Sequence, residues 1–393
     1  MKVYLDNAAT TKLDKCVLDE MIPYLTDVYG NASSIHSFGR EAQEAVDNAR
    51  MKIAKLLGAT DSEIYFTSGG TESDNWVLNG IAKNYKNKGK HIITTKIEHP
   101  AMLNTCAKLE KEGYSITYLD VNKEGIIELS SLENAVREDT ILVSVMFANN
   151  EIGSIQPIEK IGAFCKEKGI LFHTDAVQAA TSIRIDLNKF NIDMLSMSAH
   201  KFNGPKGVGL LYIRNGINIA SFINGGHQER NYRAGTTNTP AIVGMAKALE
   251  ITYKNMEENN KKILKLRDYF VDKILENIPD CKINGSKNNR LLGNVNIGFD
   301  YVKGESMVIA LDLKGIAVSS GSACVAGSSE PSYVIAALGG KKEDSENSVR
   351  FSIGKDNTIE EIDYTIEVLI KLVSKMREVS SLFKIIKGGT LEV

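Results

Sequence analysis

The sequence of 393 residues has little of what marks a membrane, secreted or nucleic-acid-binding protein. It contains no apolar run of about eighteen residues or more, so we expect no transmembrane helix and no membrane partner. The formal net charge is only −2, which provides no overall basic field for nucleic acid. Residues 1–6 lack the apolar region of a signal peptide. We therefore expect a cytoplasmic protein without a direct nucleic-acid partner.

Cysteine is scarce, and the positions of the cysteines exclude two common uses. The five are Cys16, Cys106, Cys165, Cys281 and Cys324. They are odd in number and widely spaced, no CxxC pair occurs, and no Cys/His cluster has the spacing of a zinc site. The sequence thus predicts no disulfide framework and no metal site, and it fits free thiols in a reducing compartment.

Strand-like and helix-like stretches alternate from about residue 60 to residue 215, and several of the strand candidates are apolar throughout, as strands buried on both faces are. The strand candidates are residues 64–67, 91–95, 115–119, 141–147, 169–174 and 193–198. Helical stretches follow the first two of them, the second with a proline in its first turn. This alternation predicts an α/β fold with a mostly parallel sheet wrapped by helices.

The rest of the chain has a different pattern. A long helical region covers about residues 241–278, and strands follow near 294–298 and 349–353. The last clear helix begins with a capping box formed by Thr358 and Glu361. Its apolar residues step by three and four and predict one buried face, formed by Ile359, Ile362, Ile366, Leu369, Val373 and Met376. We predict a smaller α+β domain here, joined by a strand at residues 3–5.

Candidate functional residues lie just after the predicted strands, where α/β sheets bind ligands. The segment TSGGTE at residues 67–72 contains Gly70 and Thr71, and it suits either a phosphate at a helix N-terminus or a plain turn. Asp175, with Gln178 three residues later, is either a solvated loop acid or the partner of a protonated pyridine nitrogen. Lys201 follows Ser and His in SAHKFNGPKG, and Lys206 is the alternative amine.

Three further candidates are less specific. A lone histidine such as His99, in EHPA, is more often structural, and Asn150, in NNEIG, suits a ligand contact or a turn equally. Cys324 lies in residues 319–329, where ten of eleven residues are Ser, Gly, Ala or Cys. A segment with such small side chains cannot anchor itself in a core. We therefore expect a mobile loop and an accessible thiol.

Taken together, these segments resemble the cysteine desulfurases of the NifS/IscS type, which belong to the class-V aminotransferase family of pyridoxal-phosphate (PLP) enzymes of fold type I. The matching segments, in the order of the family, are TSGGTES, EHPA, NNEIG, HTDAVQ, SAHKFNGPKG, RAGTTN, SSGSAC and VRFSIG. The resemblance covers nearly the whole chain. It implies a large PLP-binding domain with a seven-stranded sheet over residues 16–255, and a small domain formed by residues 1–15 and 256–393.

The resemblance also implies a role for each matching residue. Lys201 would hold PLP covalently, Asp175 would pair with the pyridine nitrogen, Gln178 would bind the phenolic oxygen, and His99 would stack on the ring. The phosphate would be held by Gly70, Thr71, Ser198, His200 and, from the partner subunit of a homodimer, Thr236. Asn150 and Arg350 would bind the carboxylate of L-cysteine, and Cys324 would accept the sulfur as a persulfide.

The expected activity is the conversion of L-cysteine to L-alanine, with sulfur passed to an acceptor protein such as an iron–sulfur scaffold or a tRNA-thiolation enzyme. The alternative within the same family is a selenocysteine lyase or another class-V enzyme. A catalytically idle scaffold for sulfur-relay partners is the alternative of a different class. Cys324 favours the cysteine desulfurase, because an aminotransferase needs no thiol on a mobile loop.

Overall fold

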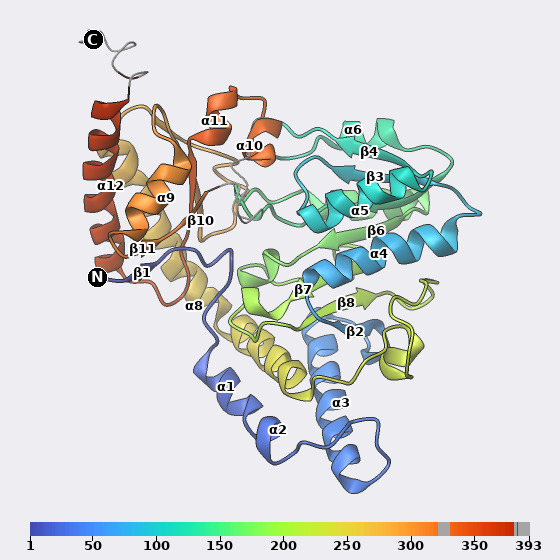
Figure 1. Ribbon diagram of the computed structural model, residues 1–393. Helices are drawn as coiled ribbons and strands as arrows, with labels where there is room; N and C mark the ends of the chain where they lie inside the picture. The colour runs from blue at the N-terminus through green and yellow to red at the C-terminus, as the bar shows by residue number, and fades with distance from the viewer. Residues whose placement is uncertain (321–330, 381–382, 384–393) are drawn as a thin grey trace.

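The larger part of the molecule is built on a mostly parallel sheet, which has seven strands within residues 1–320, 331–380 and 383, the residues that the computed structural model describes (Figure 1). In spatial order the strands are β2 (Ile64–Thr67), β8 (Gly209–Ile213), β7 (Met194–Ser198), β6 (Leu171–Asp175), β5 (Thr140–Ser144), β3 (His91–Thr95) and β4 (Ser115–Leu119). β8 runs opposite to the other six strands of this sheet. The predicted fold class is confirmed; β8 was not among the predicted strands.

Helices cover both faces of this sheet because successive strand residues point to opposite sides. Ile92 and Leu142 belong to a cluster that includes α4 and α5, whereas their neighbours Ile93 and Val143 belong to the cluster that includes α3, α7 and α8. The helices of the larger part are α1 (Lys15–Met21), α2 (Pro23–Thr26), α3 (Ser37–Leu57), α4 (Gly70–Tyr85), α5 (Pro100–Lys111), α6 (Leu129–Ala135), α7 (Ile158–Lys168) and α8 (Thr239–Asn277).

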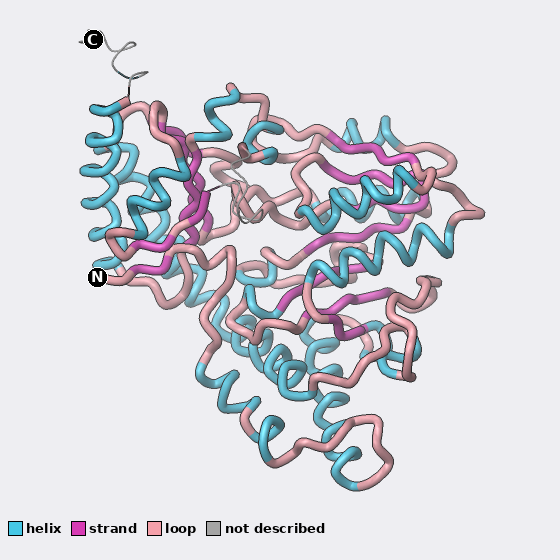
Figure 2. The backbone as a smooth tube through the Cα atoms, in the orientation of Figure 1, coloured by secondary structure: helices cyan, strands magenta, loops and turns pink. Residues whose placement is uncertain are grey.

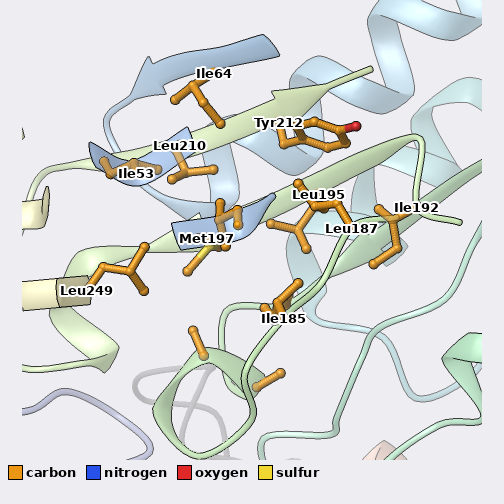
Figure 3. Close-up of a cluster of buried hydrophobic side chains, with 14 of the residues drawn as sticks. Ile53, Ile64, Ile185, Leu187, Ile192, Leu195, Met197, Leu210, Tyr212 and Leu249 are labelled. Carbon is orange, nitrogen blue, oxygen red and sulfur yellow. The ribbon is translucent and has the colours of Figure 1, made fainter. Parts of the chain in front are cut away.

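The cluster on the α3 and α8 face forms the main core, part of which Figure 3 shows. Leu195 and Leu210 of neighbouring strands lie there with Ile53 of α3 and Leu249 of α8, all fully buried. Burying one such side chain contributes about 1.5–3 kcal/mol relative to leaving it exposed. This core fixes β7 and β8, and therefore the turn that carries Lys201 between them.

A smaller α+β part lies apart from the large sheet, on the side of the two termini (Figure 2). Its elements are β1 (Val3–Tyr4), β9 (Cys281–Ile283), β10 (Asn294–Phe299), β11 (Ile316–Ala317), β12 (Ser319–Ser320), β13 (Ser348–Ser352), α9 (Gly304–Asp312), α10 (Tyr333–Ala337), α11 (Lys342–Glu346) and α12 (Ile359–Val379). The antiparallel order is β12-β13-β10-β9, and β1 pairs with β11. The predicted N-terminal strand therefore joins this part.

The helix α12 matches its prediction except at one residue. The capping box of Thr358 and Glu361 is formed, and Ile362 is fully buried. Ile359, however, is 40% exposed, so its placement on the buried face was wrong. It is the first residue of the helix and stands beyond the hydrophobic cluster that covers the following turns.

The long helix α8 connects the two parts. Leu249 lies in the core of the large sheet, whereas Ile263 and Phe270 of the same helix lie in the core of the smaller part. The predicted domain division after residue 255 falls inside this helix and stays a prediction. In the described part of the chain, no helix combines the length and apolarity needed to cross a bilayer.

Candidate active site

The carboxyl ends of β3, β5, β6 and β7 open onto one cleft, which contains about 910 Å³ of space not filled by atoms. The predicted residues that line it are Gly70, Thr71, His99, Asn150, Asp175, Gln178, Ser198, His200, Lys201 and Arg350. Parallel strands end at the same edge of a sheet, which explains why residues from distant parts of the sequence meet. Cys324 lies outside the described residues.

Lys201 reaches the cleft from a short turn that follows β7. Its Nζ donates hydrogen bonds to the carbonyl oxygens of Ala8, at 2.6 Å, and Ala9, at 2.7 Å. The N-terminal segment therefore holds the amine at the cleft wall. Lys206, the alternative amine, is exposed and does not line the cleft. The geometry favours Lys201 as the reactive amine.

Asp175 ends β6 and is 7% exposed. One carboxylate oxygen accepts a hydrogen bond of 2.9 Å from the amide of Val177, which fixes the side chain. Burial raises the pKa of Asp175, and the nearby His99 and Lys201 act in the opposite direction. A buried carboxylate is stabilised by a cation placed against it, so Asp175 fits a protonated pyridine nitrogen.

A cradle for an anion lies where α4 begins. Gly70 is its first residue, and a Cβ added there would come within 2.7 Å of the Val177 side chain. Only glycine leaves this space open. The N-terminus of α4 presents free backbone N–H groups, and the hydroxyls of Thr71 and Ser198 line the same cleft. These donors fit a phosphate group.

His200 lines the cleft as a neutral ring. Its Nδ1 lies 3.1 Å from the hydroxyl of Thr10. Burial lowers the pKa of His200 to about 4, and the charges of Lys201 and Lys206 add to this effect. At neutral pH, His200 can therefore hold a phosphate by hydrogen bonding and not by charge.

His99 caps α5, because its Nδ1 accepts a hydrogen bond of 3.2 Å from the amide of Ala101. Burial lowers the pKa of His99, so the ring is neutral at pH 7. With Nδ1 as an acceptor, the neutral ring carries its hydrogen on Nε2. His99 is then a hydrogen-bond donor from Nε2, and it can bind a proton on Nδ1 only by releasing the cap.

Arg350, on β13, is 2% exposed and faces the cleft from the smaller part. Its Nη2 lies 2.8 Å from a carboxylate oxygen of Asp6, and its Nη1 donates to the carbonyl of Asn150 at 3.1 Å. Its Nε is buried without a hydrogen-bond partner among the described residues. A planar guanidinium with unused donor capacity suits a carboxylate ligand.

Of two further predicted residues, Gln178 lies in the cleft and Thr236 lies outside it. Gln178 is buried and donates from Nε2 to the carbonyl of Ala8 at 2.9 Å, so it lies beside Lys201. Thr236 is exposed and lines a separate hollow of about 550 Å³ together with Arg233 and Thr237. A single chain therefore does not bring Thr236 to the cleft, and its contact with a partner subunit stays a prediction.

Buried acids beneath the cleft were missed by the sequence reasoning. Asp74 lines the cleft at 1% exposure, and its Oδ1 lies 3.8 Å from Nε2 of His173. Burial and then the charge of Asp175 raise the pKa of Asp74 well above its usual range. Glu98, next to His99, is fully buried. No local pattern distinguishes these acids from surface acids, because only the tertiary structure buries them.

Comparison with known proteins gives consistent results. A model of the class-V aminotransferase family matches residues 3–365. The cysteine desulfurase IscS of Methanosarcina thermophila is 52% identical over 380 residues, which cover 97% of this chain and 94% of that protein. A solved NifS-like protein superposes with a TM-score of 0.90 at 40% identity, covering 95% of this chain and all of that one. A structure described as SspA in complex with cysteine has a TM-score of 0.81 at 36% identity, with coverages of 91% and 100%.

Proposed function

Because this chain belongs to the class-V aminotransferase family, we propose that it is a cysteine desulfurase, which converts L-cysteine to L-alanine and retains the sulfur. The observation that carries this proposal is one cleft that holds the amine of Lys201, the carboxylate of Asp175 and the guanidinium of Arg350. These groups provide a covalent anchor, a partner for a ring cation and a receptor for an amino-acid carboxylate.

The cofactor of this cleft is PLP, which, when bound, withdraws electrons from the Cα of an attached amino acid. Lys201 would hold it covalently, and Asp175 would keep its ring nitrogen protonated. Gln178 and His99 would contact the ring, while the cradle of Gly70, Thr71, Ser198 and His200 would bind the phosphate. The donor set supports this assignment, because its amine, carboxylate and anion cradle match the three parts of the molecule.

The substrate carboxylate binds Arg350 and Asn150 at the side of the cleft formed by the smaller part. With the substrate in the cleft, the amine of Lys201 would move the Cα proton. Positioned proton transfer of this kind contributes roughly 10²–10⁴-fold to the rate. Lys201 is supported in this role by its place in the same cleft as Arg350.

Cys324 takes the sulfur. Its thiolate attacks the sulfur of the substrate, so an S–S bond forms while the C–S bond breaks, and the carbon fragment is protonated and leaves as alanine. The persulfide on Cys324 is then passed to an acceptor protein. The acceptors we propose are an iron–sulfur scaffold or a tRNA-thiolation enzyme, in the cytoplasm.

The protein acts as a homodimer in which Thr236 contacts the phosphate of the partner subunit's cofactor. Exposed apolar side chains support this arrangement, since Tyr29 is 70% and Ile35 is 92% exposed. The same loop lies beside the segment that carries Thr236, because Ser33 accepts a hydrogen bond of 3.4 Å from Gln228. Contiguous exposed apolar patches mark protein interaction sites.

The test uses two variants, each with a matched control. Cys324→Ala should keep bound PLP but lose release of sulfide from L-cysteine, whereas Cys16→Ala, at an exposed cysteine, should keep both. Lys201→Ala should lose the lysine adduct that borohydride reduction fixes, whereas Lys206→Ala should keep it. Undiminished sulfide release by Cys324→Ala would show that another group is the nucleophile.

A further inference from the structure

The turn formed by residues 149–153 is held in place by hydrogen bonds of the Asn149 side chain. Asn149, fully buried, accepts hydrogen bonds at Oδ1 from the amides of Glu151, at 2.9 Å, and Ile152, at 3.0 Å. Its Nδ2 donates to the carbonyl of Ile97 at 2.8 Å. The larger part of the molecule therefore fixes the position of this turn, which follows β5 at the edge of the cleft.

The smaller part contacts this turn through several side-chain donors that converge on two neighbouring residues, Asn150 and Glu151. Arg350 donates to the carbonyl of Asn150, Asn294 and Asn296 donate to the carbonyl of Glu151 at 3.2 and 3.1 Å, and Ser332 donates to the Glu151 carboxylate at 2.6 Å. These donors come from β13, from β10 and from the start of α10.

The Glu151 side chain makes a contact that is separate from the substrate site. It is 2% exposed, and Ser332, its partner, is the N-cap of α10, with Oγ also accepting from the amide of Ile335 at 3.1 Å. The same helix is bound to the larger part by the hydroxyl of Tyr333, which donates to the carbonyl of Glu98 at 2.6 Å. Ser332 follows Cys324 by eight residues in the sequence.

We propose that Glu151 is a positioning residue that fixes the start of α10 against the side of the cleft that binds the substrate carboxylate. This inference rests on the proposed function. The backbone carbonyl of Glu151 binds β10 beside Asn150, whereas its carboxylate binds Ser332. The two contacts therefore act on different steps: the carbonyl on substrate binding, and the carboxylate on sulfur transfer to Cys324.

The test separates these steps through KM and kcat for alanine formation from L-cysteine. Glu151→Ala and Ser332→Ala should each lower kcat roughly tenfold, as expected for loss of a buried hydrogen bond, with KM changed less than about twofold. Glu151→Gln keeps an acceptor for Ser332 and should restore most of kcat. Asn294→Ala should instead raise KM and leave kcat nearly unchanged.

Thr358→Ala is the matched control, because it removes the N-cap of α12, away from the cleft, and should alter neither parameter. Persulfide on Cys324, measured by mass spectrometry after a single turnover, should fall in parallel with kcat. Unchanged kcat in both Glu151→Ala and Ser332→Ala would overturn the proposal, as would a rise in KM alone.

If Glu151→Ala does not fold, Glu151→Gln and Ser332→Ala decide by the same measurements: a fall in kcat only in Ser332→Ala supports the proposal, and equal values in both overturn it. If the unmodified protein forms no alanine from L-cysteine, the proposed function itself fails. That outcome is distinct from an active enzyme whose kcat does not depend on Glu151.

Discussion

Glu98 makes the stability of the larger part of the molecule depend on pH, and replacement of Glu98 by Gln should remove this dependence. The side chain is fully buried, and its Oε1 accepts hydrogen bonds from the amide of Met146 at 2.9 Å and from the hydroxyl of Thr95 at 2.8 Å. Burial raises its pKa from 4.5 to about 8. The folded protein thus binds this proton more tightly than the unfolded chain does, and stability decreases as the pH rises from 4.5 to about 8.

The expected size follows from this pKa. One proton that is retained only in the folded state changes the free energy of unfolding by about 1.36 kcal/mol per pH unit. Between about pH 5.5 and 7.5, the unmodified protein should lose about 2.7 kcal/mol that Glu98→Gln does not lose. The amide places an N–H group where Oε2 has no partner among the described residues, which costs about 1–3 kcal/mol at every pH. The prediction therefore concerns how the free energy of unfolding changes with pH, and not its absolute value at one pH.

The measurement is urea unfolding followed by fluorescence at several pH values. Trp76 is the only tryptophan in the sequence and is fully buried in the same larger part as Glu98, so its emission reports the unfolding of that part. Glu133→Gln, at an exposed acid, controls for the loss of one carboxyl. Parallel dependences of the unfolding free energy on pH for the unmodified protein and Glu98→Gln would refute the reasoning.

The geometry predicts the outcomes of four other substitutions. Arg350→Lys should raise KM for L-cysteine roughly 10- to 100-fold in steady-state assays of alanine formation, because an ammonium lacks the fork of donors that a carboxylate accepts. In urea unfolding, Ile362→Ala should cost about 2–5 kcal/mol, while Ile359→Ala, at the exposed start of the same helix, should cost less than about 1 kcal/mol. Arg50→Met should cost about 3–5 kcal/mol by the same measurement, because it leaves Glu229 without its buried partner at 2.8 Å.

The sequence predicted the strands of the large sheet where hydrophobic pattern decides them. Residues 91–95 were assigned correctly, because four of the five are Ile or Thr, whose β-branched side chains favour strands. β8 was missed for a topological reason. It follows the Gly/Pro-rich turn after Lys201 directly and is antiparallel to β7, so no helix separates the two strands to indicate it.

The predicted site residues met in the cleft because most of them follow strand ends, a position that can be recognised from the sequence. Asp175 and Lys201 each occupy such a position, and parallel topology brings them to one edge. Contacts between distant segments could not be predicted in this way. The pairing of Arg350 with Asp6 and the bond from Ser332 to Glu151 depend on how the smaller part docks, which no local pattern encodes.

The buried acids beneath the cleft bear on where a negative charge can face the cation of a cofactor ring. Asp74, Glu98 and Asp175 are all shielded from water, and like charges in a medium of low dielectric constant cannot all ionise. Burial and the charge of Asp175 raise the pKa of Asp74 well above its usual range. Burial raises the pKa of Glu98 to about 8, so Glu98 is mostly protonated near neutral pH. Asp175 is the acid of this group whose pKa the nearby His99 and Lys201 lower against the effect of burial. Within this group of acids the neighbouring cationic groups therefore favour the carboxylate form most directly at Asp175, the place where a ring cation needs it.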